Sequence, residues 1–173
     1  MNKFLSKQRL IILGLAIMGV TSSYGQAVGD EFTVENDAAN LVYHITLYSG
    51  TANGDNQVSV LGTADSPEET TIPQEVIDDK NNKYKVVSIF RFANATKVKK
   101  LNVPEGVTTI SEGAFNRLGS LQEINLPASL SAIEKSAFAY CTNLSKITVA
   151  EGNQFFSTDE QSILYNKYLE PYN

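Results

Sequence analysis

Residues 110–126 read ISEGAFNRLGSLQEINL, and residues 133–149 read IEKSAFAYCTNLSKITV. Aligned at an offset of 23 residues, the two segments share an apolar skeleton and little else. The matched pairs are Ile110 and Ile133, Phe115 and Phe138, Leu121 and Leu144, Ile124 and Ile147, and Leu126 and Val149. A fixed period in the twenties is typical of a solenoid, in which each coil buries its apolar side against the next coil.

The same frame extends one unit further towards the N-terminus. Its members there are Val87, Phe92, Val98, Leu101 and Val103, after which Pro104 matches Pro127 and Val107 matches Leu130. We therefore expect three stacked coils, which start near residues 87, 110 and 133. The fold class that follows is a mainly β repeat solenoid.

Each unit contains a short segment in which apolar and polar residues alternate, at residues 101–103, 124–126 and 147–149. This alternation predicts a strand with one buried face, and stacking at a common register predicts a parallel sheet with one strand per coil. Between the strands, the spacing of Ala114, Phe115 and Leu118 predicts a short helical turn that Gly119 ends. The three phenylalanines of the frame should stack as an aromatic ladder inside the coils, namely Phe92, Phe115 and Phe138.

The units EGAFNRLGSLQEINLPASLSAI and KSAFAYCTNLSKITV resemble the BspA-like leucine-rich repeats, whose pattern is I-x-x-x-A-F-x-x-C-x-x-L-x-x-I-x-L-P. The resemblance covers about residues 84–153. Residues 70–76 and 81–89 resemble the lead-in of that family, and residues 156–167 resemble its other unit, with Glu160 where the family usually has glycine. The first coil departs from the pattern at Val87 and Arg91. The resemblance implies a bacterial extracellular or surface repeat protein that serves binding and adhesion.

Residues 1–25 have the composition of a secretory signal peptide. Lys3, Lys7 and Arg9 precede eleven apolar residues at 10–20, and small residues follow, so cleavage after Gly25 and cleavage after Ala27 both fit. The apolar run is too short to span a bilayer, which takes about 20 residues. We therefore expect an exported protein, extracellular or on the cell surface, with the periplasm left open, and no transmembrane segment after signal removal.

The remaining chain divides into three predicted parts. Residues 26–83 form an N-terminal β cap, residues 84–153 form the solenoid, and residues 154–173 form a C-terminal hairpin and tail. The cap is expected because EFTVEN, LVYHITLYS and NQVSVLG are rich in strand-forming residues with turn signals between them. The hairpin should cover the open edge of the last coil with Phe155, Phe156, Ile163, Leu164 and Tyr165.

Charge is distributed unevenly along the chain. Without residues 1–25 the chain has 11 basic and 19 acidic residues, a balance that does not suit non-specific nucleic-acid binding. Residues 26–79 hold eleven acids and no base, whereas residues 80–117 hold eight bases and two acids. Either the two halves attract each other across the surface, or the basic segment faces an anionic partner.

Few residues have the spacing that catalysis or metal binding requires. His44 is the single histidine and is predicted to be a surface or edge residue, since a zinc site needs three or four ligands. Residues 78–83 lack the order of a calcium loop, which favours a solvated turn. Cys141 cannot form an internal disulfide, and its equivalents Leu118 and Ala95 predict a small buried hydrophobe. We expect no cofactor, no metal and no catalysis, although a carboxylate pair for glycan hydrolysis stays open.

The residues between the buried positions of the strands should point outward in two columns, and we predict that they contact a partner. They are Lys100, Asn102, Glu123, Asn125, Lys146 and Thr148. The alternative is that Lys100, Glu123 and Lys146 form an alternating-charge ladder that favours strand registry. The expected partner is an extracellular protein or glycan bound by a monomer. Three strands with two outward residues each cover a footprint of roughly 150 Å². A stable protein interface takes roughly 800 Å² from each partner, so binding through this surface should be weak or multivalent. A shortened structural relative of a longer adhesin is the other open alternative.

Overall fold

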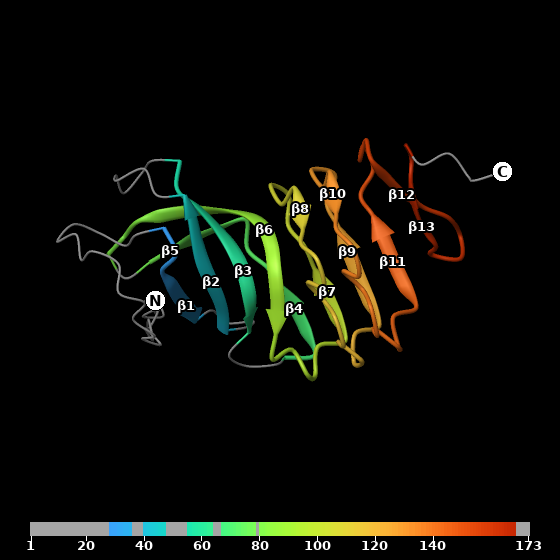
Figure 1. Ribbon diagram of the computed structural model, residues 1–173, viewed down its shortest axis with the longest axis horizontal. Helices are drawn as coiled ribbons and strands as arrows, with labels where there is room; N and C mark the ends of the chain where they lie inside the picture. The colour runs from blue at the N-terminus through green and yellow to red at the C-terminus, as the bar shows by residue number, and fades with distance from the viewer. Residues whose placement is uncertain (1–27, 36–39, 48–54, 64–66, 79, 169–173) are drawn as a thin grey trace, which may run out of the picture.

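The computed structural model describes residues 28–35, 40–47, 55–63, 67–78 and 80–168, and the predicted signal peptide lies outside these ranges (Figure 1). The described chain contains strands and turns, arranged in three sheets. The largest sheet has seven strands, the second has four and the third is a two-stranded hairpin.

The N-terminal part is an antiparallel meander of β1 (Glu31–Glu35), β2 (Asn40–Leu47) and β3 (Gln57–Thr63). Its apolar residues alternate as expected, and Leu41, Tyr43 and Ile45 of β2 are fully buried, whereas Leu47 at the strand end is 43% exposed. The meander is not separate from the solenoid. β3 pairs in parallel with β6 (Lys83–Ala93), so the cap and the solenoid share one sheet.

The solenoid coils contribute strands to both large sheets, and Figure 1 shows these strands stacked side by side from green to red. One side is built by β4 (Glu69–Thr71), β7 (Lys100–Asn102), β9 (Glu123–Leu126) and β11 (Lys146–Val149). All three neighbouring pairs are parallel, and Leu101, Ile124 and Ile147 are register partners, which confirms the 23-residue frame here. The other side adds strands of two residues that the sequence did not predict, β8 (Thr109–Ile110) and β10 (Ala132–Ile133).

The predicted frame is wrong at the start of the first coil. Ile89, not Val87, is the register partner of Ile110, so the offset at this point is 21 residues. The cause is β3, which holds β6 extended as far as Ala93 through the Gly62–Ala93 pairing. A Cβ at Gly62 would collide with the backbone of Ala93, so only glycine permits this approach.

The helical turn predicted at Ala114, Phe115 and Leu118 is also wrong. The amides of Gly113, Phe115 and Arg117 donate to carbonyls of the next coil at 3.1, 2.8 and 2.9 Å, whereas the amides of Ala114, Asn116 and Leu118 bond within the segment. A helix would keep every bond within the segment and every φ negative. Here Gly113 and Arg117 have φ angles of 62° and 65°, so the segment is a series of tight turns. Gly119, predicted to end the helix, is not among the positive-φ residues.

The aromatic ladder is present. The ring centroids of Phe92 and Phe115 are 6.0 Å apart, and those of Phe115 and Phe138 are 5.3 Å apart. Phe115 in the middle coil is fully buried, whereas Phe138 in the last coil is half-buried. The middle coil therefore has neighbours on both sides, as a stacked repeat requires.

Two hairpins complete the fold. β5 (Glu75–Ile77) pairs with the start of β6, and β12 (Phe156–Thr158) pairs with β13 (Leu164–Asn166). In the second hairpin, Phe156 and Leu164 pack against the core. The other three residues predicted to cover the last coil are exposed, at 37% for Phe155, 52% for Ile163 and 47% for Tyr165.

Candidate functional site

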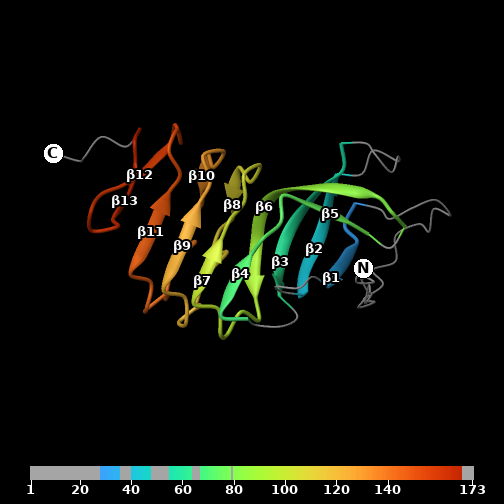
Figure 2. The same ribbon diagram turned by 180° about the vertical axis from the view of Figure 1, so that it is seen from behind.

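All six residues predicted to contact a partner lie on the outward side of the four-stranded sheet, whose strands face the viewer in Figure 2. The structure extends their two columns onto β4. The first column is Glu69, Lys100, Glu123 and Lys146, and the second is Thr71, Asn102, Asn125 and Thr148. We call these eight residues the sheet face.

Acidic and basic side chains alternate along the first column and form two ion pairs. Lys100 Nζ lies 3.2 Å from Glu69 Oε1, and Lys146 Nζ lies 3.1 Å from Glu123 Oε1. The hydrogen bond from Lys100, followed by the charge of Lys100, lowers the pKa of Glu69. These pairs are exposed to solvent, so their main effect is to favour the observed strand register.

Side-chain hydrogen bonds connect the second column. Asn125 Nδ2 donates to Asn102 Oδ1 at 2.6 Å, and Asn102 Nδ2 donates to Thr71 Oγ1 at 2.9 Å. Much of the hydrogen-bonding capacity of the sheet face is therefore used within the protein. A partner has to contact these groups from above without separating them, because each separated pair would have to be replaced.

Four ion pairs join the acidic N-terminal segment to the basic segment that follows it. They are Lys83 with Glu75 at 3.5 Å, Lys85 with Asp55 at 3.1 Å, Lys99 with Glu68 at 2.8 Å and Lys100 with Glu69 at 3.2 Å. The interpretation that the two halves attract each other is confirmed for these four lysines. Within the described ranges, Arg91 and Arg117 form no ion pair.

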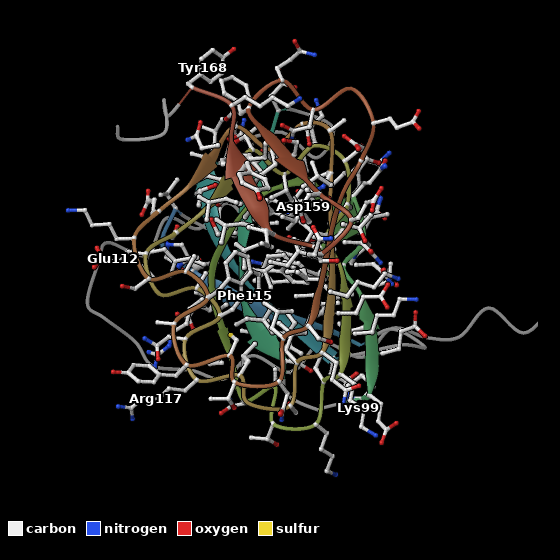
Figure 3. The ribbon with its side chains drawn as sticks, turned by 90° about the vertical axis from the view of Figure 1, so that its right-hand side faces the viewer. Lys99, Glu112, Phe115, Arg117, Asp159 and Tyr168 are labelled. Atoms are coloured by element: carbon white, nitrogen blue, oxygen red, sulfur yellow. The ribbon has the colours of Figure 1, made fainter. Side chains whose placement is uncertain are left out.

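Those two arginines line a cleft of about 1250 Å³ on one flank of the solenoid. Its lining residues are 90–96 of the first coil, 111–114 and 116–120 of the second coil, and Glu134 of the third, and we call it the flank cleft. Phe90, at its edge, is 58% exposed. Figure 3 shows Glu112 and Arg117 together on this flank and Lys99 on the opposite side of the molecule.

The position of the cleft follows from the unequal length of the coils. Only Phe90 and Arg91 separate Ile89 from Phe92, whereas four residues separate Ile110 from Phe115. The second coil has its extra turn where the first coil has none, and the flank cleft opens at this step. Sequence reasoning missed the cleft, although Arg91 in place of the family's alanine was a signal for it.

Two aspartates that could suggest calcium binding are occupied by internal hydrogen bonds. Asp78 accepts from the amides of Lys80 and Asn82 at 2.9 and 2.8 Å, from Asn82 Nδ2 at 2.7 Å and from the Tyr84 hydroxyl at 3.1 Å. It is buried, so the turn at residues 78–83 is not simply solvated as predicted. Asp159 accepts in the same way from Gln161, Ile163 and Tyr165. Each carboxylate therefore closes a hairpin turn.

The remaining reactive side chains are isolated. His44 is half-buried on β2, which has β1 and β3 on its two sides. Cys141 packs against the core as predicted but is only half-buried, and its Sγ lies 3.0 Å from the carbonyl oxygen of Phe115. Desolvation raises the pKa of this thiol.

In the part of the chain that the structure describes, no three or more His, Cys, Asp or Glu side chains come together in a way that could hold a metal ion. The same residues include no helix with the length and hydropathy needed to cross a membrane.

Comparison with known proteins identifies the repeat. Residues 71–170 match the BspA type leucine rich repeat region in six copies, and no curated protein matches the chain. A leucine-rich repeat protein from Bacteroides ovatus has a similar structure, with a TM-score of 0.53 and 30% identity over 65% of this chain. The match spans only 31% of the length of that protein.

Two other solved structures are more distant. A leucine-rich repeat protein from Bacteroides capillosus matches with 19% identity and a TM-score of 0.45, over 68% of this chain and 98% of that one. The pneumococcal vaccine antigen PcpA matches with 17% identity and a TM-score of 0.34, over 82% of this chain and 55% of that one. The repeat match covers more than half of the sequence, so this chain belongs to the BspA-type leucine-rich repeat family.

Proposed function

We propose that this chain is an exported, non-catalytic binding protein of the bacterial surface, and that an extracellular protein or glycan contacts its sheet face. One observation carries the proposal. Eight polar side chains stand at fixed spacing on four parallel strands, and seven of them, all but Thr148, form ion pairs or hydrogen bonds with one another. Repeat proteins use such extended, ordered surfaces for binding.

Export is supported by the composition of residues 1–25, and a surface location agrees with membership of a family of bacterial repeat proteins. Adhesion is the role that fits both export and a surface location. The proposed protein acts as a monomer, needs no cofactor and does not bind nucleic acid, since the exported chain has an acidic surplus.

The size of the sheet face sets the expected affinity. Four strands about 4.8 Å apart, with two outward residues each, cover roughly 200 Å². A stable protein interface takes about 800 Å² from each partner. We therefore expect weak binding by one molecule, strengthened where many copies stand on one surface.

The alternating charges allow a test that spares the fold. The fourfold variant E69K, K100E, E123K and K146E reverses the first column but keeps opposite charges next to each other. The purified variant and the unchanged protein are compared for thermal unfolding and for binding to immobilised extracellular-matrix proteins and glycans. Loss of binding without loss of stability supports the sheet face as the contact surface.

A matched control reverses an ion pair outside the sheet face. Asp55→Lys with Lys85→Asp exchanges the charges of an exposed pair between the cap and β6, and it should leave binding unchanged. If the fourfold variant binds as well as the unchanged protein, the first column serves strand registry alone and the proposal fails.

A further inference from the structure

We infer that the flank cleft is a second binding site, and that it takes a neutral oligosaccharide. The cleft does not belong to the sheet face. Its walls are the end of β6 and turns on the other flank of the solenoid, so the two surfaces can be tested separately (Figure 3).

The residues that line the cleft include Arg91 and Arg117, which carry guanidinium groups, and Glu112 and Glu134, which carry carboxylates. These planar groups donate or accept two hydrogen bonds at once, which suits adjacent hydroxyl groups on a sugar ring.

Two of these groups are held in position by the protein. Glu134 Oε2 accepts a hydrogen bond from the Glu112 amide at 2.9 Å. The guanidinium of Arg117 lies 5.7 Å from the centroid of the Tyr140 ring, within the range of a cation–π contact. Groups that are already ordered lose less conformational entropy when a ligand binds.

The charges of the cleft are balanced, because its lining contains two arginines and two glutamates, whose formal charges cancel. A lining with no net formal charge gives a phosphate or sulfate ligand little overall electrostatic attraction. An uncharged ligand with many hydroxyl groups meets a partner at both kinds of side chain.

Phe90 contributes an aromatic ring to the lining of the cleft. Phe90 is 58% exposed although it stands in a strand next to the core. An aromatic face contacts the apolar C–H face of a sugar ring, while the polar groups bind its edge. The volume of about 1250 Å³ exceeds the roughly 300–1,000 Å³ of pockets for single small molecules, which favours an oligosaccharide.

The test is a titration of the purified protein with cellohexaose, maltohexaose, mannohexaose and chitohexaose, with a heparin hexasaccharide as the anionic probe. Binding is measured by calorimetry and by chemical-shift changes. The variants are Phe90→Ala, Arg91→Ala and Glu112→Gln, all at exposed positions where the fold is not at risk. Ile77→Ala is the matched control, because Ile77 is an exposed apolar residue that does not line the cleft.

We expect at least one neutral probe to bind, each cleft variant to weaken that binding at least tenfold, and Ile77→Ala to leave it unchanged. The fourfold sheet-face variant should also bind this probe normally, which separates this site from the proposed function. Binding that no cleft variant weakens overturns the inference. So does binding of the heparin hexasaccharide alone, or binding of none of the probes.

Discussion

Asp78 and Asp159 each accept hydrogen bonds from residues two, four and six positions further along the chain. In both cases two amides and a tyrosine hydroxyl converge on one carboxylate. The two turns also share a positive φ three residues after the aspartate, 66° at Asn81 and 61° at Ser162. A single spacing of Asp and Tyr thus specifies two hairpins at opposite ends of the repeat region.

The two aspartates differ in burial, and this difference gives a prediction. Asp78→Ala removes the acceptor of three buried hydrogen bonds and should lower the free energy of unfolding by roughly 2–4 kcal/mol. Asp159→Ala exposes its donors to water, so the loss should be clearly smaller. Urea unfolding of both variants checks this. Equal losses of unfolding free energy in the two variants would show that the burial of the aspartate does not determine the size of the effect.

Acid should loosen the second hairpin. The hydrogen bond from Tyr165, followed by that from the Ile163 amide, lowers the pKa of Asp159 in the folded protein. The folded state therefore binds fewer protons than the unfolded state at this group. The stabilisation that the Asp159 carboxylate gives to the folded protein is complete above the pKa of this group in the unfolded chain, about 3.9. It is lost as the pH falls through the lower pKa that Asp159 has in the folded protein.

The measurement is an NMR titration of the Tyr165 ring and the Ile163 amide from neutral to acidic pH. In Asp159→Asn, the pH dependence of both signals should disappear. A pH dependence that persists in this variant would assign the effect to another carboxyl.

Cys141 should react slowly as a thiol. Desolvation raises its pKa, and the reactive species is the thiolate. We expect Ellman's reagent at pH 8 to label the folded protein several-fold more slowly than free cysteine. In urea the rate should approach that of free cysteine, and equally fast labelling of the folded protein would contradict the partial burial described here.

The strands show best what the sequence encodes at the scale of the element. Leu101, Ile124 and Ile147 could be aligned from the sequence because a buried face imposes an alternation that is visible in one segment alone. The turns could not be predicted in this way. The spacing of Ala114, Phe115 and Leu118 suits a helix as well as a series of turns, and the choice depends on amides bonded to the next coil.

The register of the first coil could not be predicted from its own residues either, because it depends on a strand far away in the sequence. Its register depends on β3, a strand more than twenty residues away that keeps β6 extended. The flank cleft follows from that register, so it could not be found without the cap. The outward columns, in contrast, were predictable residue by residue, and only their extension onto β4 was missed.

The aromatic ladder predicts a graded response to substitution. Phe115→Ala removes a fully buried ring and should cost about 3–5 kcal/mol of unfolding free energy. Phe138→Ala removes a half-buried ring from the last coil and should cost less. Chemical unfolding of the two variants gives the comparison, and a larger loss for Phe138 would mean that the ladder does not depend on neighbours at both sides.

At the scale of the whole molecule, each coil depends on the coils beside it, and the edge of the stack should therefore open first. In a solenoid, stability is a sum of coil terms and nearest-neighbour interface terms. β9 has a strand on both sides, whereas β11 has β9 on one side and is an edge of its sheet. The half-buried apolar residues of β11, Ile147 and Val149, agree with this difference.

Amide hydrogen exchange checks this expectation. Hydrogen-bonded amides of β9 should exchange more slowly than those of β11, because local opening takes less free energy at the edge. The amides of β3 and β6 should be protected like those of β9, since each of these strands has a neighbour on both sides within the seven-stranded sheet. Uniform exchange across all four strands would instead indicate one cooperative unit.

The hydrogen bonds between turns also have a genetic consequence. Amides in the turn of the second coil donate to carbonyls in the turn of the third coil at matching positions. Two units of the same length can therefore stack on each other with these hydrogen bonds formed. Inserting a single codon within a coil changes the separation of every donor and acceptor that lie on opposite sides of the insertion. Duplicating or deleting a whole unit of 23 codons leaves all of these pairings possible. Chains of this kind can therefore change length in evolution by whole coils, while the exposed residues of each coil diverge on their own.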